Sequence, residues 1–196
     1  MSDRDRSGLL VHICCAPCAE YPLKVLAEEP FDLHGFYYNP NIHPAEEWRR
    51  RMEGVRFLTG IRGIPCMYDD TILQEEWETE GSSGTGRMCA RCYGMRMEKA
   101  AETARSLGIP AFTTTLLVSP YQRHDLLREQ AERAAERAGV RFLYRDFRPG
   151  YRAGQEMARQ DGIYRQKYCG CIDSLNESSF RERILREHQA LRDRQV

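Results

Sequence analysis

The sequence has no excess of either charge, no run of apolar residues long enough to cross a membrane and no low-complexity segment. Its 29 basic residues balance its 29 acidic residues, so any contact with RNA must come from a local patch rather than from a global field. A membrane span needs ~20 apolar residues, and no stretch approaches that length. The apolar run at residues 9–13 is also too short for the core of a signal peptide. These absences favour a cytoplasmic protein that works without a membrane.

The 196 residues suffice for one domain with a substantial core, and we expect residues 1–7 and about 190–196 to be flexible ends. Short apolar runs predict strands at residues 9–14, 33–38, 64–68, 111–118 and 142–144. Amphipathic stretches predict helices at 19–29, 45–62, 92–107 and 125–138, and from 176 onward. This alternation predicts an α/β fold with a parallel sheet and helices on both faces. Ligands of such sheets bind beyond the carboxyl ends of the strands.

Cysteine, in contrast, is abundant, and seven of the eight cysteines fall into three groups. They are Cys14-Cys15-Ala-Pro-Cys18, Cys89-Ala-Arg-Cys92 and Cys169-Gly-Cys171. Thiolates at such short spacings can converge on a metal. A reducing cytoplasm disfavours disulfides, and adjacent cysteines cannot bridge without strain. We therefore expect a cysteine-ligated metal site at the strand ends, with Cys66 as an ordinary buried thiol.

Three interpretations of these thiols stay open on spacing alone. A four-iron cluster takes four protein ligands, as does a structural zinc, so seven grouped thiols favour more than one metal ion. A second interpretation is that the two Cys-x-x-Cys pairs, Cys15/Cys18 and Cys89/Cys92, bind a structural zinc. The chain would then be a zinc-stabilised RNA-binding module without redox chemistry. A thiol–disulfide oxidoreductase explains Cys15 and Cys18 at the start of a helix, but it leaves the other groups without a role.

Longer strings around the cysteines resemble a known family. The strings are His12-Ile-Cys-Cys-Ala-Pro-Cys18, Phe36-Tyr-Tyr-Asn-Pro-Asn-Ile-His-Pro44, Cys89-Ala-Arg-Cys92, Phe112-Thr-Thr-Thr-Leu-Leu-Val-Ser-Pro120 and Tyr164-Arg-Gln-Lys-Tyr-Cys-Gly-Cys171. They resemble the epoxyqueuosine reductases of the QueH type from about Leu9 to Cys171. The resemblance implies a HUP-type (Rossmann-like) α/β fold. It also implies an oxidoreductase that converts epoxyqueuosine to queuosine at the tRNA wobble position without cobalamin, as the final step of tRNA queuosine biosynthesis.

The resemblance further implies a [4Fe–4S] cluster beside an additional mononuclear iron ion. Its implied ligands are Cys14, Cys15, Cys89, Cys92, Cys169 and Cys171. Some relatives have aspartate where this chain has Cys18, which makes Cys18 a seventh candidate ligand. The implied partners are tRNA carrying epoxyqueuosine and a low-potential electron donor that the sequence does not identify. The turn at residues 14–18 has no glycine and contains a proline, so it is poorly suited to phosphate and disfavours an ATP-dependent activity.

Further candidates lie near the expected strand ends and the last cysteine pair. The candidate catalytic residues are Cys14, Cys18, Tyr164 and Asp173. The candidate substrate contacts are Tyr38, Asn39, Asn41, Thr114, Arg91, Arg165, Gln166 and Lys167, with the cations expected to face RNA phosphates. His12 lies in an apolar run, which predicts a hydrogen-bonded core residue. The glycine-rich residues 81–86 are a candidate lid.

Overall fold

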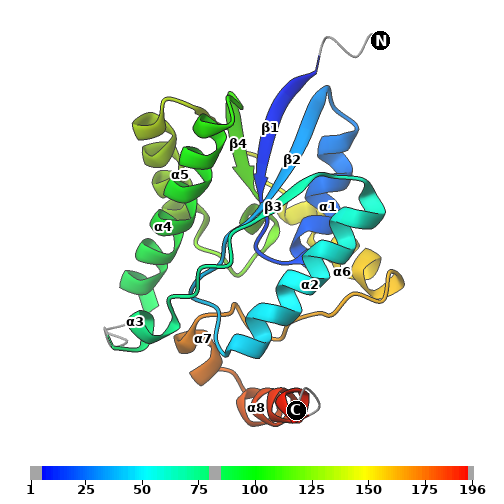
Figure 1. Ribbon diagram of the computed structural model, residues 1–196, viewed down its shortest axis with the longest axis vertical. Coiled ribbons are helices and arrows are strands. Elements are labelled where there is room, and N and C mark those ends of the chain that lie inside the picture. The colour runs from blue at the N-terminus through cyan, green and yellow to red at the C-terminus, as the bar shows by residue number, and fades with distance from the viewer. Residues whose placement is uncertain (1–5, 80–84, 194–196) are drawn as a thin grey trace.

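Five parallel strands form the centre of the molecule in the order β3-β2-β1-β4-β5 (Figure 1). The computed structural model describes residues 6–79 and 85–193. The strands are β1 (Ser7–His12), β2 (Phe31–Tyr37), β3 (Cys66–Tyr68), β4 (Ala111–Thr114) and β5 (Arg141–Phe142). Leu9 of the central strand pairs with Leu33 on one side and with Ala111 on the other. The middle of β1, Leu9–Val11, is wholly apolar and buried because helices cover both faces of the strand.

Helices lie on both faces of this sheet and beyond the carboxyl ends of its strands (Figure 1). They are α1 (Ala16–Ala27), α2 (Ala45–Arg62), α3 (Gln74–Thr79), α4 (Thr85–Ser106), α5 (His124–Ala138), α6 (Tyr151–Gln160), α7 (Ile172–Asn176) and α8 (Arg181–Arg192). Two 3-10 turns are η2 (Thr115–Val118) and η3 (Arg148–Gly150). Helix α1 packs against α2 and α6, whereas α4 packs against α5 on the other side of the sheet. The expected parallel sheet with helices on both faces is therefore confirmed.

Element boundaries follow local chemistry. Helix α2 has the predicted bounds and ends at Gly63, whose φ of 63° is the left-handed conformation that glycine adopts without cost. Helix α1 begins earlier than expected because Pro17 lies in its first turn, where a missing N–H is tolerated. Helix α4 also begins earlier, so Cys89 and Cys92 both lie on it, one turn apart. The run at 111–118 leaves the sheet after Thr114 and continues as η2.

From β1 the chain adds β2 and β3 on one side of the sheet, and it then returns to add β4 and β5 on the other side. The order of the strands therefore reverses between β1 and β4. In open parallel sheets, ligands bind in the crevice at this reversal, beyond the carboxyl ends of the two strands. The chain leaves β1 toward Cys14 and leaves β4 toward Thr115, so both segments enter this crevice. Helices α7 and α8 lie beyond the same edge, at the bottom of the view (Figure 1).

Parts of two predictions lie outside the described residues: residues 1–5 and 194–196 at the ends, and residues 81–84 of the candidate lid. Ser7 lies in β1, and α8 extends to Arg192. Within the described ranges, none of the helices has both the length and the apolar composition that crossing a bilayer requires.

Candidate metal centre

Three thiols meet where β1 leads into α1. The Sγ atoms of Cys14, Cys15 and Cys18 all lie within 4.8 Å of one another, and those of Cys14 and Cys15 are 3.8 Å apart. Two thiolates that bind one tetrahedral ion at ~2.3 Å are themselves separated by ~3.8 Å. All three side chains are buried. This trio therefore has the spacing of ligands to a single metal ion.

Contacts around the trio favour the thiolate form of Cys14 even before a metal ion binds. Hydrogen bonds from Cys15 and Cys18 hold the pKa of the Cys14 thiol well below its ordinary value, and Thr115 donates to the same sulfur from Oγ1 at 3.3 Å. Burial raises the pKa of Cys15, and hydrogen bonding to the Cys14 sulfur raises that of Cys18. Three buried thiols become three thiolates only with a cation among them, which is the chemistry of a metal site.

The other four grouped cysteines line a neighbouring pocket of about 200 Å³. Cys89 and Cys92 come from α4, whereas Cys169 and Cys171 lie just before α7. Burial raises the pKa of Cys89, Cys92 and Cys171, and repulsion from the neighbouring thiolates adds to this effect. Four cysteines are the ligand set of a four-iron cluster, whose cationic core offsets such repulsion. The donor set of this pocket therefore fits a cluster.

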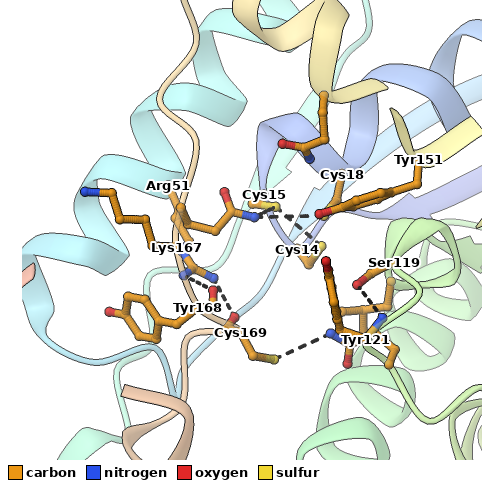
Figure 2. Close-up of a pocket in the computed structure, with 14 residues that line it drawn as sticks. Cys14, Cys15, Cys18, Arg51, Ser119, Tyr121, Tyr151, Lys167, Tyr168 and Cys169 are labelled. Atoms are coloured by element: carbon orange, nitrogen blue, oxygen red, sulfur yellow. Dashed lines mark hydrogen bonds between the residues drawn. The ribbon is translucent and has the colours of Figure 1, made fainter. Parts of the chain in front are cut away.

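The two thiol-lined pockets adjoin each other. The pocket at the trio measures about 350 Å³, and Tyr121, Gln122 and Cys169 line both pockets. Figure 2 shows the sulfur atoms of Cys14 and Cys15 close together, with Cys169 across the pocket from them. Nε2 of Gln122 donates to Sγ of Cys169 at 3.5 Å. Cys169 thus lies at the boundary between a set of three thiols and a set of four.

Arg51 of α2 holds the last cysteine pair in place. Its buried guanidinium donates to the carbonyl oxygen of Cys169 at 2.6 Å and to that of Tyr168 at 3.0 Å. Gly170 has a φ of 129°, and a Cβ atom at this residue would lie 2.7 Å from Nη1 of Arg51. Both the backbone conformation and the close approach of Arg51 explain the glycine in Cys169-Gly170-Cys171.

A buried carboxylate, Glu47, in turn holds Arg51. Glu47 accepts hydrogen bonds from Nε of Arg51 at 2.7 Å and from the Tyr164 hydroxyl at 2.7 Å, and it lies 3.1 Å from Nε2 of His188 on α8. Burial raises the pKa of Glu47, but the Arg51 charge and the hydrogen bonds from His188 and Tyr164 outweigh burial and lower it to about 2. This network joins α2, α8 and the loop that carries the last cysteines.

Comparison with known proteins identifies the family. A family model described as Epoxyqueuosine reductase QueH matches residues 9–177. The chain belongs to the QueH family. The Epoxyqueuosine reductase QueH of Dehalococcoides mccartyi is 35% identical over 169 residues, which cover 86% of this chain and 93% of the relative. That of Thermotoga maritima is 34% identical over 182 residues, which cover 86% and 91% of the two chains. The resemblance indicated by the sequence is confirmed.

A solved structure supports the fold of this QueH-family chain. A predicted subunit of tRNA methyltransferase from Methanocaldococcus jannaschii superposes with a TM-score of 0.52 at 11% identity, over 78% of this chain and 74% of that chain. Likeness at this identity shows the fold alone. It agrees with the α/β architecture of this chain, a parallel sheet with helices on both faces, in which Cys14, Cys15 and Cys18 follow the carboxyl end of β1.

Several residues that we selected as substrate contacts lie in the interior of this QueH-family protein. Oγ1 of Thr114 accepts a hydrogen bond from the N–H of Leu116 at 3.2 Å and lies 2.9 Å from Nδ1 of His12. Nε2 of His12 lies 3.1 Å from the carbonyl oxygen of Tyr38. Burial and the Arg96 charge lower the pKa of His12 to about 4, so the ring is neutral. His12 is the hydrogen-bonded core residue that the sequence predicts.

The two asparagines after β2 also point inward. Nδ2 of Asn39 donates to the carbonyl oxygen of Ile13 at 2.9 Å. Nδ2 of Asn41 donates to Sγ of Cys92 at 3.4 Å, and its Oδ1 accepts from Arg96 at 2.7 Å. Asn41 therefore supports a thiol of the four-cysteine pocket, and it does not line the pocket at the trio.

The polar candidates near the last cysteine pair divide into different environments. Gln166 contacts the trio, with Nε2 at 2.8 Å from Sγ of Cys15. Lys167 lines the larger pocket and pairs with Glu187 at 3.2 Å, whereas Arg165 is exposed. Asp173 lines the four-cysteine pocket. Tyr164 is not among the described residues that line either pocket, and its contact with Glu47 gives it a structural role.

Two arginines of α4 lie against other groups of the protein, including Arg91, which was expected to face RNA phosphates. Arg96 is buried, and the guanidinium of Arg91 lies 4.6 Å from the ring centroid of Trp77. The side chain of Arg87 is outside the described residues. Sequence reasoning did not select Tyr121, Tyr151 and Gln155, which line the larger pocket. Tyr121 directly follows the string that ends at Pro120, and this position was the only signal that could have found it.

Proposed function

We propose that this chain reduces the epoxide of epoxyqueuosine in tRNA to the alkene of queuosine, without cobalamin. In this proposal Cys89, Cys92, Cys169 and Cys171 hold a [4Fe–4S] cluster, and Cys14, Cys15 and Cys18 hold a further iron ion. Membership of the QueH family supports the substrate. The observation that supports the metal assignment is the separation of seven thiols into adjoining sets of four and three.

The proposed reaction removes the epoxide oxygen as water and consumes two electrons and two protons. When bound, the cluster and the iron ion would supply single electrons and a Lewis-acidic position for oxygen, respectively. A set of three protein ligands is typical of catalytic metal sites, which keep one position for water or substrate. The low-potential electron donor is a separate partner of the reaction.

The residues around the trio would bind the substrate and exclude water. Leu116 contributes an apolar wall, while Ser119, Gln122 and Gln155 bring polar groups that can bind substrate hydroxyls. The pocket encloses the three buried thiols, so a nucleoside that fills it would displace bulk water from the reacting bond.

Asp173 is our candidate for holding a proton near the metal centre. Its side chain is buried at the four-cysteine pocket, and its Oδ2 atom has no hydrogen-bond partner within the described part of the chain. A buried carboxyl oxygen without a partner is costly to leave unpaired, and it is placed to contact a ligand in this pocket. Cys14 and Cys18 stay candidate reacting thiols as well as ligands.

Anaerobic purification followed by metal analysis and an activity assay tests this proposal. We expect a brown protein with about four sulfides and five irons per chain. With a chemical reductant, it should convert epoxyqueuosine to queuosine in tRNA, measured by mass spectrometry of the nucleosides. Cys66→Ser is a suitable control, because Cys66 lies in β3 and lines neither pocket. A colourless protein with only zinc would instead favour the zinc-stabilised RNA-binding module.

A further inference from the structure

Tyr121 is unusually exposed for an aromatic residue at a pocket. Its side chain is 81% exposed, the largest value among the exposed large hydrophobic residues of the described chain. Yet Tyr121 lines both thiol-lined pockets and therefore lies at their common mouth. An exposed aromatic ring at the rim of a pocket is a feature of ligand recognition more than of core packing.

Neighbouring residues fix the position of this ring. The N–H of Tyr121 donates to Oγ of Ser119 at 3.3 Å, and the N–H of Gln122 donates to the carbonyl oxygen of Ser119 at 3.3 Å. The ring of Tyr151 lies 5.9 Å from that of Tyr121 at an interplanar angle of 83°. Figure 2 shows Tyr121 and Tyr151 on one side of the pocket, opposite Lys167 and Tyr168. This edge-to-face contact orients Tyr121 while most of its surface stays open.

The dimensions and charges of the site favour a single nucleoside with its phosphate outside. A volume of about 350 Å³ is near the lower limit for ligand sites, ~300–1,000 Å³, and leaves no room for a whole loop of RNA. Arg123, the second residue after Tyr121, is exposed and lines the adjoining pocket. RNA-binding proteins recognise bases of single-stranded loops by stacking them on aromatic rings and by binding the adjacent phosphates with cations.

We propose that Tyr121, oriented by Tyr151, stacks on the base of the epoxyqueuosine nucleotide. This inference rests on the proposed function and assigns to its site a base-binding surface. The stacked base leaves the anticodon loop and enters the trio pocket, and Arg123 lies beside the emerging phosphate. The aromatic face provides the binding energy, so the contribution of Tyr121 does not require its hydroxyl group.

The experiment measures binding of an RNA hairpin to the metal-loaded protein. The probe is an anticodon stem-loop with 2-aminopurine at the wobble position, whose fluorescence is quenched when the base stacks on an aromatic ring. Tyr121→Leu keeps an apolar side chain but removes the ring, and Tyr121→Phe keeps the ring. Tyr144→Leu is a control for loss of a part-exposed tyrosine that lines neither pocket. Unchanged circular dichroism and metal content establish that each variant is folded.

We expect Tyr121→Leu to abolish the quenching and to weaken binding by roughly 5- to 100-fold, the range of a single base–aromatic stack. Tyr121→Phe and Tyr144→Leu should bind within about twofold of the parent. Equal affinity and quenching in Tyr121→Leu would overturn the inference, even if epoxyqueuosine is reduced. Conversely, ring-dependent quenching in a protein that fails to reduce epoxyqueuosine would refute the proposed function and leave the stacking surface in place.

Discussion

The Nε2 atom of Gln166 donates a 2.8 Å hydrogen bond to the Sγ atom of Cys15. The same nitrogen lies 3.9 Å from Sγ of Cys18, so one amide group contacts two of the three thiols in the trio. These contacts join the loop after α6 to the first cysteine group across 151 residues of sequence. A donor beside a sulfur stabilises the thiolate, which is the form that binds metal.

Replacing Gln166 with alanine should therefore weaken the metal affinity of the trio. Loss of a hydrogen bond to a metal ligand typically costs ~10- to 100-fold in affinity. The measurement is competition between the protein and a chelator for Co²⁺ or Fe²⁺ under anaerobic conditions. Gln155→Ala is the matched control, because Gln155 lines the same pocket and its replacement should leave the affinity within about threefold. Equal affinities for all three proteins would argue against a supporting role of Gln166.

Serine substitutions should separate the two proposed metal sites. We expect Cys89→Ser and Cys171→Ser to lose most of the acid-labile sulfide together with the visible colour, because four thiols hold the cluster. Cys18→Ser should keep about four sulfides and lose about one iron per chain. Analysis of iron and sulfide in anaerobically purified variants tests both expectations. Loss of sulfide in Cys18→Ser with retention in Cys89→Ser would reverse the assignment.

Gly170→Ala should destabilise the loop that carries the last cysteine pair. A φ of 129° is strained for alanine, and the new Cβ would lie 2.7 Å from Nη1 of Arg51. Backbone strain of this kind costs ~1–3 kcal/mol, which lowers the midpoint of thermal unfolding by roughly 2–12 °C. Gly60→Ala is the control: this residue lies in α2, and a Cβ atom added to it would meet nothing within 4 Å, so helix propensity should raise the midpoint slightly.

The fold follows from local sequence patterns because each pattern has a local cause. Helix α2 could be predicted with its bounds, since an amphipathic run ends at a glycine in the left-handed conformation. The start of α1 was harder to predict because Pro17 suggests a helix that begins after it, whereas proline is well tolerated in the first turn. The early start of α4 could not be predicted, because the glycine-rich residues 81–86 are typical of a loop and glycine disfavours a helix.

The site was predictable in its residue types but less so in their partners. Cys15/Cys18 and Cys89/Cys92 have the same spacing, yet the first pair spans a helix start and the second lies within a helix. Their division between two pockets depends on long-range packing, which spacing does not encode. Likewise, Asn41 shows no sequence sign that its amide contacts Cys92 and Arg96 when α4 packs beside β1.

The carboxylate of Glu47 should make the stability of the protein depend on pH in the acid range. Its pKa in the folded state is about 2, below the ordinary value of 4.5, so folding favours the ionised form. The stabilisation is therefore complete above pH 4.5 and is lost as the pH falls toward 2. The groups that face Glu47 are Arg51 on α2, His188 on α8 and Tyr164 on the connecting loop.

Glu47→Gln should lower the free energy of unfolding by about 3 kcal/mol at pH 7, because it leaves the buried Arg51 without its counter-charge. The difference between the parent and the variant should shrink as the pH falls from 4.5 toward 2, since the unfolded parent takes up a proton on this carboxylate there while the folded parent stays ionised. Urea unfolding of both proteins at a series of pH values measures this difference, in which effects shared by the two proteins cancel. Glu132→Gln, which removes an exposed partner of Arg128, should leave the free energy of unfolding nearly unchanged at every pH. If the difference in free energy of unfolding between the two proteins is the same from pH 7 to pH 3, Glu47 acts through its shape and hydrogen bonds, without a net contribution from its charge.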